Sequence, residues 1–231
     1  MSDNKFSQLD KNNVSAVGQL KKSGPVSMVN DGESGIKVLL VGNSITRHGI
    51  ATHIGWHGDW GMAASDIQKD YAHLLLDKVN KDGKCARFCI CQVAEWERNY
   101  KDGNTLFEKY QSARDFDADI IVMRIIENCP KTDFDEQLFK IKYNELIRYL
   151  DPSQKAKIII TTGFWHHPGD TAIIDYAKQN DLPLIELGDL GEMDEMKAVG
   201  LFEHNGVANH PGDLGMQMIA DRIYEQLKTV L

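Results

Sequence analysis

Five short apolar runs recur along the chain after residue 35, each bounded by polar or turn-forming residues. They cover residues 36–41, 86–93, 119–125, 156–162 and 183–187. Apolar runs of this length suit strands that are buried on both faces. Most of them are separated by segments whose apolar residues recur at helical spacing. Strands that alternate with helices predict one α/β domain with a five-stranded parallel sheet, covered by helices on both faces.

The helical spacing is clearest in four segments, which cover residues 67–79, 138–150, 170–180 and 219–227. In the last of these, Ile219, Ile223 and Leu227 stand at positions i, i+4 and i+8 and form one apolar stripe. Pro211 is expected to be the first residue of this final helix, because a proline there loses no helical hydrogen bond. The preceding residue, His210, then lies at the start of the helix, where the chain can return to the edge of the sheet.

Residues 1–35 are mostly polar and carry the turn signals Gly24-Pro25 and Asn30-Asp31-Gly32. They predict an irregular N-terminal arm before a domain that spans residues 36–231. The first residues lack the basic-then-apolar pattern of a signal peptide, so we expect a cytoplasmic protein. No apolar run approaches the roughly 20 residues of a membrane span. The net charge of −8 argues against a general affinity for nucleic acid or anionic membranes.

Four cysteines are present, and none stands in a C-x-x-C pair or at zinc-site spacing. Cys89 and Cys91 alternate within an apolar run, so we expect two buried, inert thiols on one face of a strand. Cys129 is an alternative nucleophile, but the sequence offers it no evident partner. The pattern predicts neither a metal site nor a cofactor.

Three polar residues fall where predicted strands end or where the last helix begins. Ser44 follows the first apolar run, Asn128 follows the third, and His210 precedes the final helix. Since parallel strands end at one edge of a sheet, these residues can meet there. Ser44 has two interpretations at this point: it caps the next helical segment, or it is a nucleophile.

The three side chains supply the groups that acyl transfer requires. A serine hydroxyl is a weak nucleophile until a nearby base takes its proton, and histidine titrates near neutrality. An Asn amide can donate to the oxyanion of the tetrahedral intermediate. We therefore interpret Ser44 as the candidate nucleophile, His210 as the base and Asn128 as an oxyanion donor.

These residues lie in three motifs that resemble the SGNH (GDSL-like) hydrolase family. Gly42-Asn43-Ser44-Ile45-Thr46 resembles the family's Gly-Asp-Ser-Leu block, with Asn for Asp and Ile for Leu. Ile126-Glu127-Asn128-Cys129 is similar to its Gly-x-Asn-Asp block but keeps only the Asn. His210-Pro211-Gly212-Asp213-Leu214-Gly215 is similar to its His-Pro-Asn-x-x-Gly run. The resemblance implies a flavodoxin-like three-layer α/β/α fold and a metal-free serine hydrolase of esters, often of acetyl or other short acyl groups on sugars.

The chain departs from that family at the group that orients the histidine. The family usually has Asp three residues before its histidine, where this chain has Val207. A backbone carbonyl is one substitute, and Glu203, Asp213 or Glu127 are others. Without an orienting group the tautomer of the histidine is less secure and the rate falls.

A second departure concerns the family's oxyanion glycine after its second strand. The matching stretch, residues 91–97, contains no glycine. Because any backbone N–H can serve, we assign this role to Ala94, with Gly61 as the alternative.

Two loops are expected to form walls beside the candidate site. The segment from Arg47 to Met62 leaves directly from Ser44 and contains Trp60, and Trp165 follows the fourth predicted strand. Their flat rings would suit a sugar, although loop aromatics also pack onto the domain itself. Histidines in these loops lack the carboxylate or cysteine partners of a metal site.

Two charged segments near the site have structural interpretations. Arg124, within the third strand, needs a buried partner and is expected to pair with Glu127 or Glu95. Glu95-Trp96-Glu97-Arg98 is interpreted as a packed turn whose charges are solvated.

The sequence therefore predicts an esterase or deacetylase that acts on a small-molecule or glycan ester. One alternative is a weak or inactive relative that binds a glycan or acyl ligand, and another is an acyltransferase that uses the same residues. No nucleic-acid or membrane partner is expected. The acyl group, the alcohol and the oligomeric state stay open.

Overall fold

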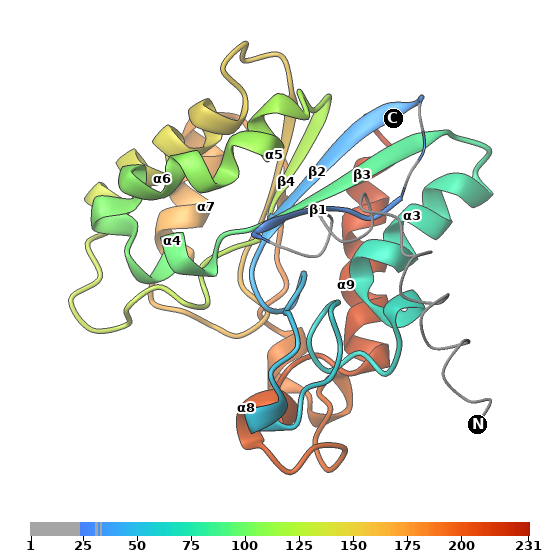
Figure 1. The fold of residues 1–231 in the computed structure, drawn as a ribbon. Helices are drawn as coiled ribbons and strands as arrows, with labels where there is room; N and C mark the ends of the chain where they lie inside the picture. The colour runs from blue at the N-terminus through green and yellow to red at the C-terminus, as the bar shows by residue number, and fades with distance from the viewer. Residues whose placement is uncertain (1–23, 31, 33) are drawn as a thin grey trace, which may run out of the picture.

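The computed structural model describes residues 24–30, 32 and 34–231, and its centre is a six-stranded sheet (Figure 1). The order across the sheet is β1-β3-β2-β4-β5-β6. The strands are β1 (Val26–Met28), β2 (Ile36–Gly42), β3 (Ala86–Gln92), β4 (Ile120–Met123), β5 (Lys157–Thr161) and β6 (Leu184–Ile185). Strands β2 to β6 are parallel, as predicted.

The expected strand count is wrong by one, because β1 pairs antiparallel with β3 at the edge of the sheet. Val26 lies opposite Cys91, and Met28 lies opposite Cys89. The described part of the expected irregular arm therefore contains a strand. Residues 1–23, 31 and 33, on which the rest of that prediction falls, lie outside the described residues.

Helices cover both faces of the sheet, which gives the three layers that the sequence predicts (Figure 1). Helices α3 and α9 pack side by side on one face, and α4 to α7 lie on the other. The helices are α3 (Tyr71–Lys81), α4 (Ala94–Arg98), α5 (Gln111–Asp115), α6 (Glu136–Leu150), α7 (Asp170–Gln179), α8 (Asn205–Ala208) and α9 (Asp213–Leu227). Short 3₁₀ helices are η1 (Thr52–Ile54), η2 (Ile67–Lys69), η3 (Tyr100–Tyr110), η4 (Leu190–Glu192) and η5 (Asp194–Met196).

Alternating side chains of the strands supply two separate apolar cores. Val38 and Leu40 of β2 face the α3–α9 layer, whereas Leu39 and Val41 face the opposite layer. All four are fully buried, as expected for a central strand covered on both faces. Cys89 and Cys91 lie together in the second core and are free thiols, in keeping with their predicted placement.

The start of the final helix differs from the prediction. Helix α9 begins at Asp213, after Gly212 in extended conformation. Pro211 instead forms a β-bridge with Lys197, so the expectation that it opens the helix is wrong. His210 therefore lies in the short connection between α8 and α9, three residues before the helix begins.

The loop after β2 and the segment around α8 lie together beyond the carboxyl end of the sheet (Figure 1). A third, smaller apolar core joins them. Its buried members come from the loop after Ser44, from the segment before α8 and from α8 itself; they are Ala51, Trp56, Met62, Ala63, Ala198 and Val207. This core fixes α8 relative to the turn after β2. Among the residues that the structure describes, no helix has both the length and the apolar character that crossing a membrane requires.

Candidate active site

A tight turn after β2 places Ser44 at the carboxyl edge of the sheet. The carbonyl of Asn43 accepts hydrogen bonds from the backbone N–H groups of Thr46 and Arg47, both at 2.9 Å. This turn requires a glycine at position 42, because a Cβ there would lie 1.8 Å from the Thr46 hydroxyl oxygen. Ser44 is partly exposed, and its carbonyl accepts from Met62 N–H at 2.9 Å.

The structure brings Ser44 and His210 into direct contact across 166 residues of sequence. Ser44 Oγ lies 2.8 Å from His210 Nε2, and His210 Nδ1 lies 2.6 Å from the carbonyl oxygen of Gly206. Because a carbonyl oxygen only accepts, Nδ1 carries the proton. Nε2 is then free to accept the Ser44 proton, which is the tautomer that a general base needs.

Burial lowers the pKa of His210 to about 4, and the Gly206 carbonyl acts in the opposite direction by favouring the protonated ring. The imidazole is therefore neutral at physiological pH. Trp165 contributes to this burial, because its ring meets the imidazole edge-on with 5.2 Å between the ring centroids.

Of the alternatives for the group that orients His210, the structure shows the backbone carbonyl. Val207 is fully buried in the third core, where it anchors α8 and hence Gly206. The candidate carboxylates are engaged elsewhere or exposed. Asp213 accepts from the backbone N–H and the hydroxyl of Ser65, and Glu203 is exposed.

The two expected wall residues have different surroundings. Trp165 lies against His210 and is partly exposed. Trp60 packs edge-on against Trp56 at 5.6 Å, and its Nε1 donates to the carbonyl of Ala64 at 3.0 Å. Trp60 thus belongs to the packing of its own loop, whereas Trp165 lies directly beside the imidazole of His210.

The backbone N–H groups that could bind an oxyanion differ in whether they already donate a hydrogen bond within the protein. Within the described residues, the Ser44 N–H has no intramolecular acceptor. The Ala94 N–H points to Gln92 Oε1 at 3.3 Å, a long bond, and the Gly61 N–H donates to Asp70 Oδ2 at 3.1 Å. Gly61 is therefore held by a buried carboxylate, while the Ala94 N–H has only a weak competitor.

Asn128 is connected to the Ser44 turn through a buried carboxylate that the sequence interpretation misses. Its Nδ2 donates to Glu97 Oε2 at 2.8 Å, which engages one of its two N–H groups. The other oxygen of Glu97 accepts from Asn43 Nδ2 at 3.1 Å. Glu97 is fully buried, so the expectation of solvated charges in residues 95–98 is wrong for this residue.

Arg124 completes this network as the expected buried cation. Its guanidinium donates to Glu127 Oε1 at 2.6 Å and also contacts Asn43 Oδ1. Glu127 in turn accepts from Asn43 Nδ2 at 2.6 Å and from Phe164 N–H at 2.9 Å. The predicted pairing of Arg124 with Glu127 is confirmed. The sequence signal for it is a charge within the apolar run of residues 119–125, and in the structure Arg124 directly follows β4.

The two carboxylates of this network have opposite pKa shifts. Burial, and then the charge of Glu127, raise the pKa of Glu97 to about 7. Burial alone would also raise the pKa of Glu127, but the adjacent Arg124 keeps it lowered. Burial also raises the pKa of the Cys129 thiol, which stays protonated and is therefore a poor nucleophile.

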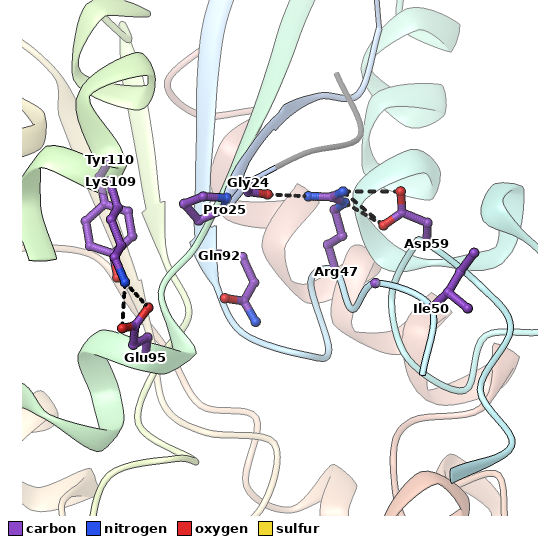
Figure 2. Close-up of a pocket in the computed structure, with 10 residues that line it drawn as sticks. Gly24, Pro25, Arg47, Ile50, Asp59, Gln92, Glu95, Lys109 and Tyr110 are labelled. Atoms are coloured by element: carbon purple, nitrogen blue, oxygen red, sulfur yellow. Dashed lines mark hydrogen bonds and ion pairs between the residues drawn. The ribbon is translucent and has the colours of Figure 1, made fainter. Parts of the chain in front are cut away.

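A cavity of about 640 Å³ opens on the β1–β3 side of this edge (Figure 2). Gln92 lies in its middle, with the Arg47–Asp59 ion pair on one side and the Lys109–Glu95 pair on the other. Neither Ser44 nor His210 lines this cavity. No group of three or more metal-ligating side chains occurs among the described residues.

Comparison with solved structures identifies the fold. The chain superposes on the psychrotrophic esterase EstA from Pseudoalteromonas sp. with a TM-score of 0.53 and 12% identity, over 84% of this chain and 97% of that one. An acetyl xylan esterase gives a TM-score of 0.52 and 19% identity, over 83% of this chain and all of that one. A two-domain esterase active on acetylated mannans gives 0.56 and 16%, over 84% of this chain and 49% of that one.

Similarity at these identities shows a shared fold, and the predicted three-layer α/β/α fold is confirmed. The lipase/acylhydrolase from Enterococcus faecalis has the same fold, with a TM-score of 0.55 and 14% identity over 84% of this chain and 96% of that one. No protein-family model and no curated protein sequence matches the chain.

Proposed function

We propose that this protein is a serine hydrolase that cleaves carboxylic esters, with short acyl groups on carbohydrate as its substrate class. One observation carries the proposal, namely the chain of contacts from Ser44 Oγ through the His210 ring to the Gly206 carbonyl. These contacts pair a nucleophile, Ser44, with a base, His210, and the Gly206 carbonyl sets the tautomer of that base. The esterases that share the fold add support.

In the proposed reaction, Ser44 Oγ attacks the carbonyl carbon of the ester while His210 Nε2 takes the hydroxyl proton. The tetrahedral intermediate then collapses, the alcohol leaves with the proton from Nε2, and an acyl-serine is formed. Water attacks this acyl-serine with His210 again acting as the base. The carboxylic acid leaves and Ser44 regains its proton, which completes the cycle.

The oxyanion is proposed to receive hydrogen bonds from the Ser44 N–H and from the N–H of Asn128 that Glu97 does not engage. The Ser44 N–H is free within the described residues, and the Asn128 side chain is fixed by its contact with Glu97. The Ala94 N–H is a third donor if its long bond to Gln92 opens on binding. Fixed donors of this kind supply much of the rate enhancement in acyl transfer.

Two observations favour an ester of a sugar. The ring of Trp165 lies beside His210 and offers a flat apolar surface next to the leaving alcohol. Two structural neighbours are described as an acetyl xylan esterase and as an esterase active on acetylated mannans.

A substrate screen with a matched pair of variants tests the proposal. We expect hydrolysis of 4-nitrophenyl acetate and of acetylated xylo- or manno-oligosaccharides, and a loss of at least about 10³-fold in kcat for Ser44→Ala. Ser65→Ala is the matched control, because its exposed hydroxyl contacts Asp213 and lies outside the proposed machinery. Full activity in Ser44→Ala would overturn the proposal. Acyl transfer to an added alcohol, in place of hydrolysis, would reassign the protein as an acyltransferase.

A further inference from the structure

We propose that Glu97 is a positioning residue of this site, and that its ionised carboxylate holds Asn128 in the orientation that serves the oxyanion. The inference rests on the proposed function and deepens it. It states that Glu97, a fully buried side chain, affects the rate of ester hydrolysis by holding Asn128 in place. It is carried by the contacts of one carboxylate with the two segments that supply Ser44 and Asn128.

Three N–H donors converge on the two oxygens of Glu97. Oε1 accepts from the Ile126 backbone N–H at 2.6 Å and from Asn43 Nδ2 at 3.1 Å. Oε2 accepts from Asn128 Nδ2 at 2.8 Å. Asn43 directly precedes Ser44, and Ile126 and Asn128 flank Glu127 in the segment after β4. One side chain on α4 therefore ties the nucleophile turn to the oxyanion segment.

The backbone at Ile126 shows why this segment needs such support. Ile126 has a φ of 145°, a region that favours glycine and is strained for a β-branched residue. Its side chain is fully buried and occupies space left by two glycines: a Cβ on Gly163 or Gly169 would lie 2.9 Å or 2.8 Å from it. The short bond from Ile126 N–H to Glu97 offsets this strain, and it fixes the direction in which the chain continues to Asn128.

The ionised form of Glu97 is the form suited to accept from all three donors. A carboxylate is a pure acceptor, whereas a protonated carboxyl carries an O–H that must itself donate. An O–H on either oxygen would face an N–H group of Asn128, Asn43 or Ile126. Protonation therefore weakens these hydrogen bonds, including the one that holds Asn128.

The surroundings of Glu97 place its protonation near neutral pH. The titratable and charged groups that act on Glu97 come from two places. Arg124, Glu127 and Cys129 lie in the segment after β4, and Tyr110 is the last residue of η3. Burial and the negative charge of Glu127 raise the pKa of Glu97 to about 7. His210 titrates well below this, with a pKa of about 4. The fall of activity on the acid side should therefore follow Glu97 and not the catalytic base.

The test compares Glu97→Gln with Glu95→Gln, a control on the same helix whose carboxylate pairs with Lys109 and touches none of these residues. For Glu97→Gln we expect kcat at pH 8 to fall about 10- to 100-fold with KM within about twofold, because a misaligned oxyanion donor weakens only the transition state. The acid limb near pH 7 should disappear from the kcat profile. Glu95→Gln should match the wild type in both respects.

A double variant distinguishes positioning through Asn128 from a general structural effect. If Glu97 acts through Asn128, Glu97→Gln should reduce kcat less than about twofold further in an Asn128→Ala background. Independent, multiplicative losses would overturn the proposal. It would equally be overturned if wild-type esterase activity is clear but Glu97→Gln retains both its kcat and its acid limb.

An activity-independent measurement keeps the proposal separate from the proposed function. In the wild-type protein, the NMR signals of the Asn128 side-chain amide should shift with an apparent pKa of about 7, the value of Glu97. The absence of such a titration would overturn the positioning role even if Glu97→Gln did not fold. Conversely, a titrating Asn128 in a protein that hydrolyses no ester would refute the proposed function alone.

Discussion

His210 Nδ1 donates a hydrogen bond of 2.6 Å to the carbonyl oxygen of Gly206. The contact sets the same tautomer that a carboxylate would set, so Nε2 can face Ser44 as an acceptor. A neutral carbonyl stabilises the imidazolium less than a carboxylate does, and we expect the base to be correspondingly weak. Val207, three residues before His210, secures α8, because its side chain is fully buried in the small third core.

Val207→Asp places a carboxylate three residues before His210, and we predict that this change does not improve catalysis. The new carboxylate would enter a site lined by Trp56, Met62 and Ala198, so burial without a partner should lower the free energy of unfolding by about 3 kcal/mol. Urea unfolding and kcat/KM, with Val207→Ala as the control for lost packing, test this expectation. An Asp variant with wild-type stability and at least tenfold higher kcat/KM would contradict it.

Trp165 is predicted to control the pKa of His210. Burial lowers that pKa to about 4, and the Trp165 ring covers one side of the imidazole. Trp165→Ala admits water, which favours the protonated ring, so the pKa should rise toward the usual value of about 6.5. The neutral base would then be lost at a higher pH than in the wild type.

An NMR titration of the His210 ring measures this change directly. Trp60→Phe provides the comparison, since Trp60 packs within its own loop, and it should leave the His210 pKa unchanged. An unchanged pKa in a folded Trp165→Ala protein would show that other groups desolvate the ring.

Gly42→Ala should disrupt the turn that presents Ser44. The added Cβ would lie 1.8 Å from Thr46 Oγ1 and 2.8 Å from Thr46 Cβ. Thr46 cannot move away easily, because it is buried and its hydroxyl is hydrogen-bonded to the Tyr71 hydroxyl. We expect a loss of at least about 2 kcal/mol in the free energy of unfolding, together with most of the activity. Gly49→Ala, whose Cβ approaches only Asp59 at 3.9 Å, should behave as the wild type in thermal unfolding. Equal stability of the two variants would argue against the required turn.

The central fold is predictable from the sequence because β2 and its parallel neighbours bury both faces, which leaves uninterrupted apolar runs. Strand β1 is not predictable in this way, since it has three residues and gains its place from pairing with β3. The prediction that Pro211 begins the final helix is wrong for a related reason. Pro211 pairs with Lys197, which is distant in sequence, and the local sequence around Pro211 does not indicate this pairing.

Within the candidate site, the sequence indicates the residues whose chemistry is local and misses those whose role depends on burial. Ser44 and His210 stand in recognisable motifs, and the structure brings them into contact. Glu97 lies in a segment with three charges in four residues, which is typical of an exposed turn. Glu97 is buried because it contacts the Asn43 and Asn128 segments, which are distant from it in sequence. The local sequence pattern therefore does not predict its burial.

The central claim is that Ser44 is a nucleophile activated by His210, and reaction with a fluorophosphonate probe measures this most directly. Intact-mass analysis and peptide mapping should find a single adduct on Ser44 of the wild-type protein. The adduct should be absent from Ser44→Ala and should form at least about 100-fold more slowly in His210→Ala. A folded wild-type protein that forms no adduct, or one that is labelled at another residue, would contradict the account.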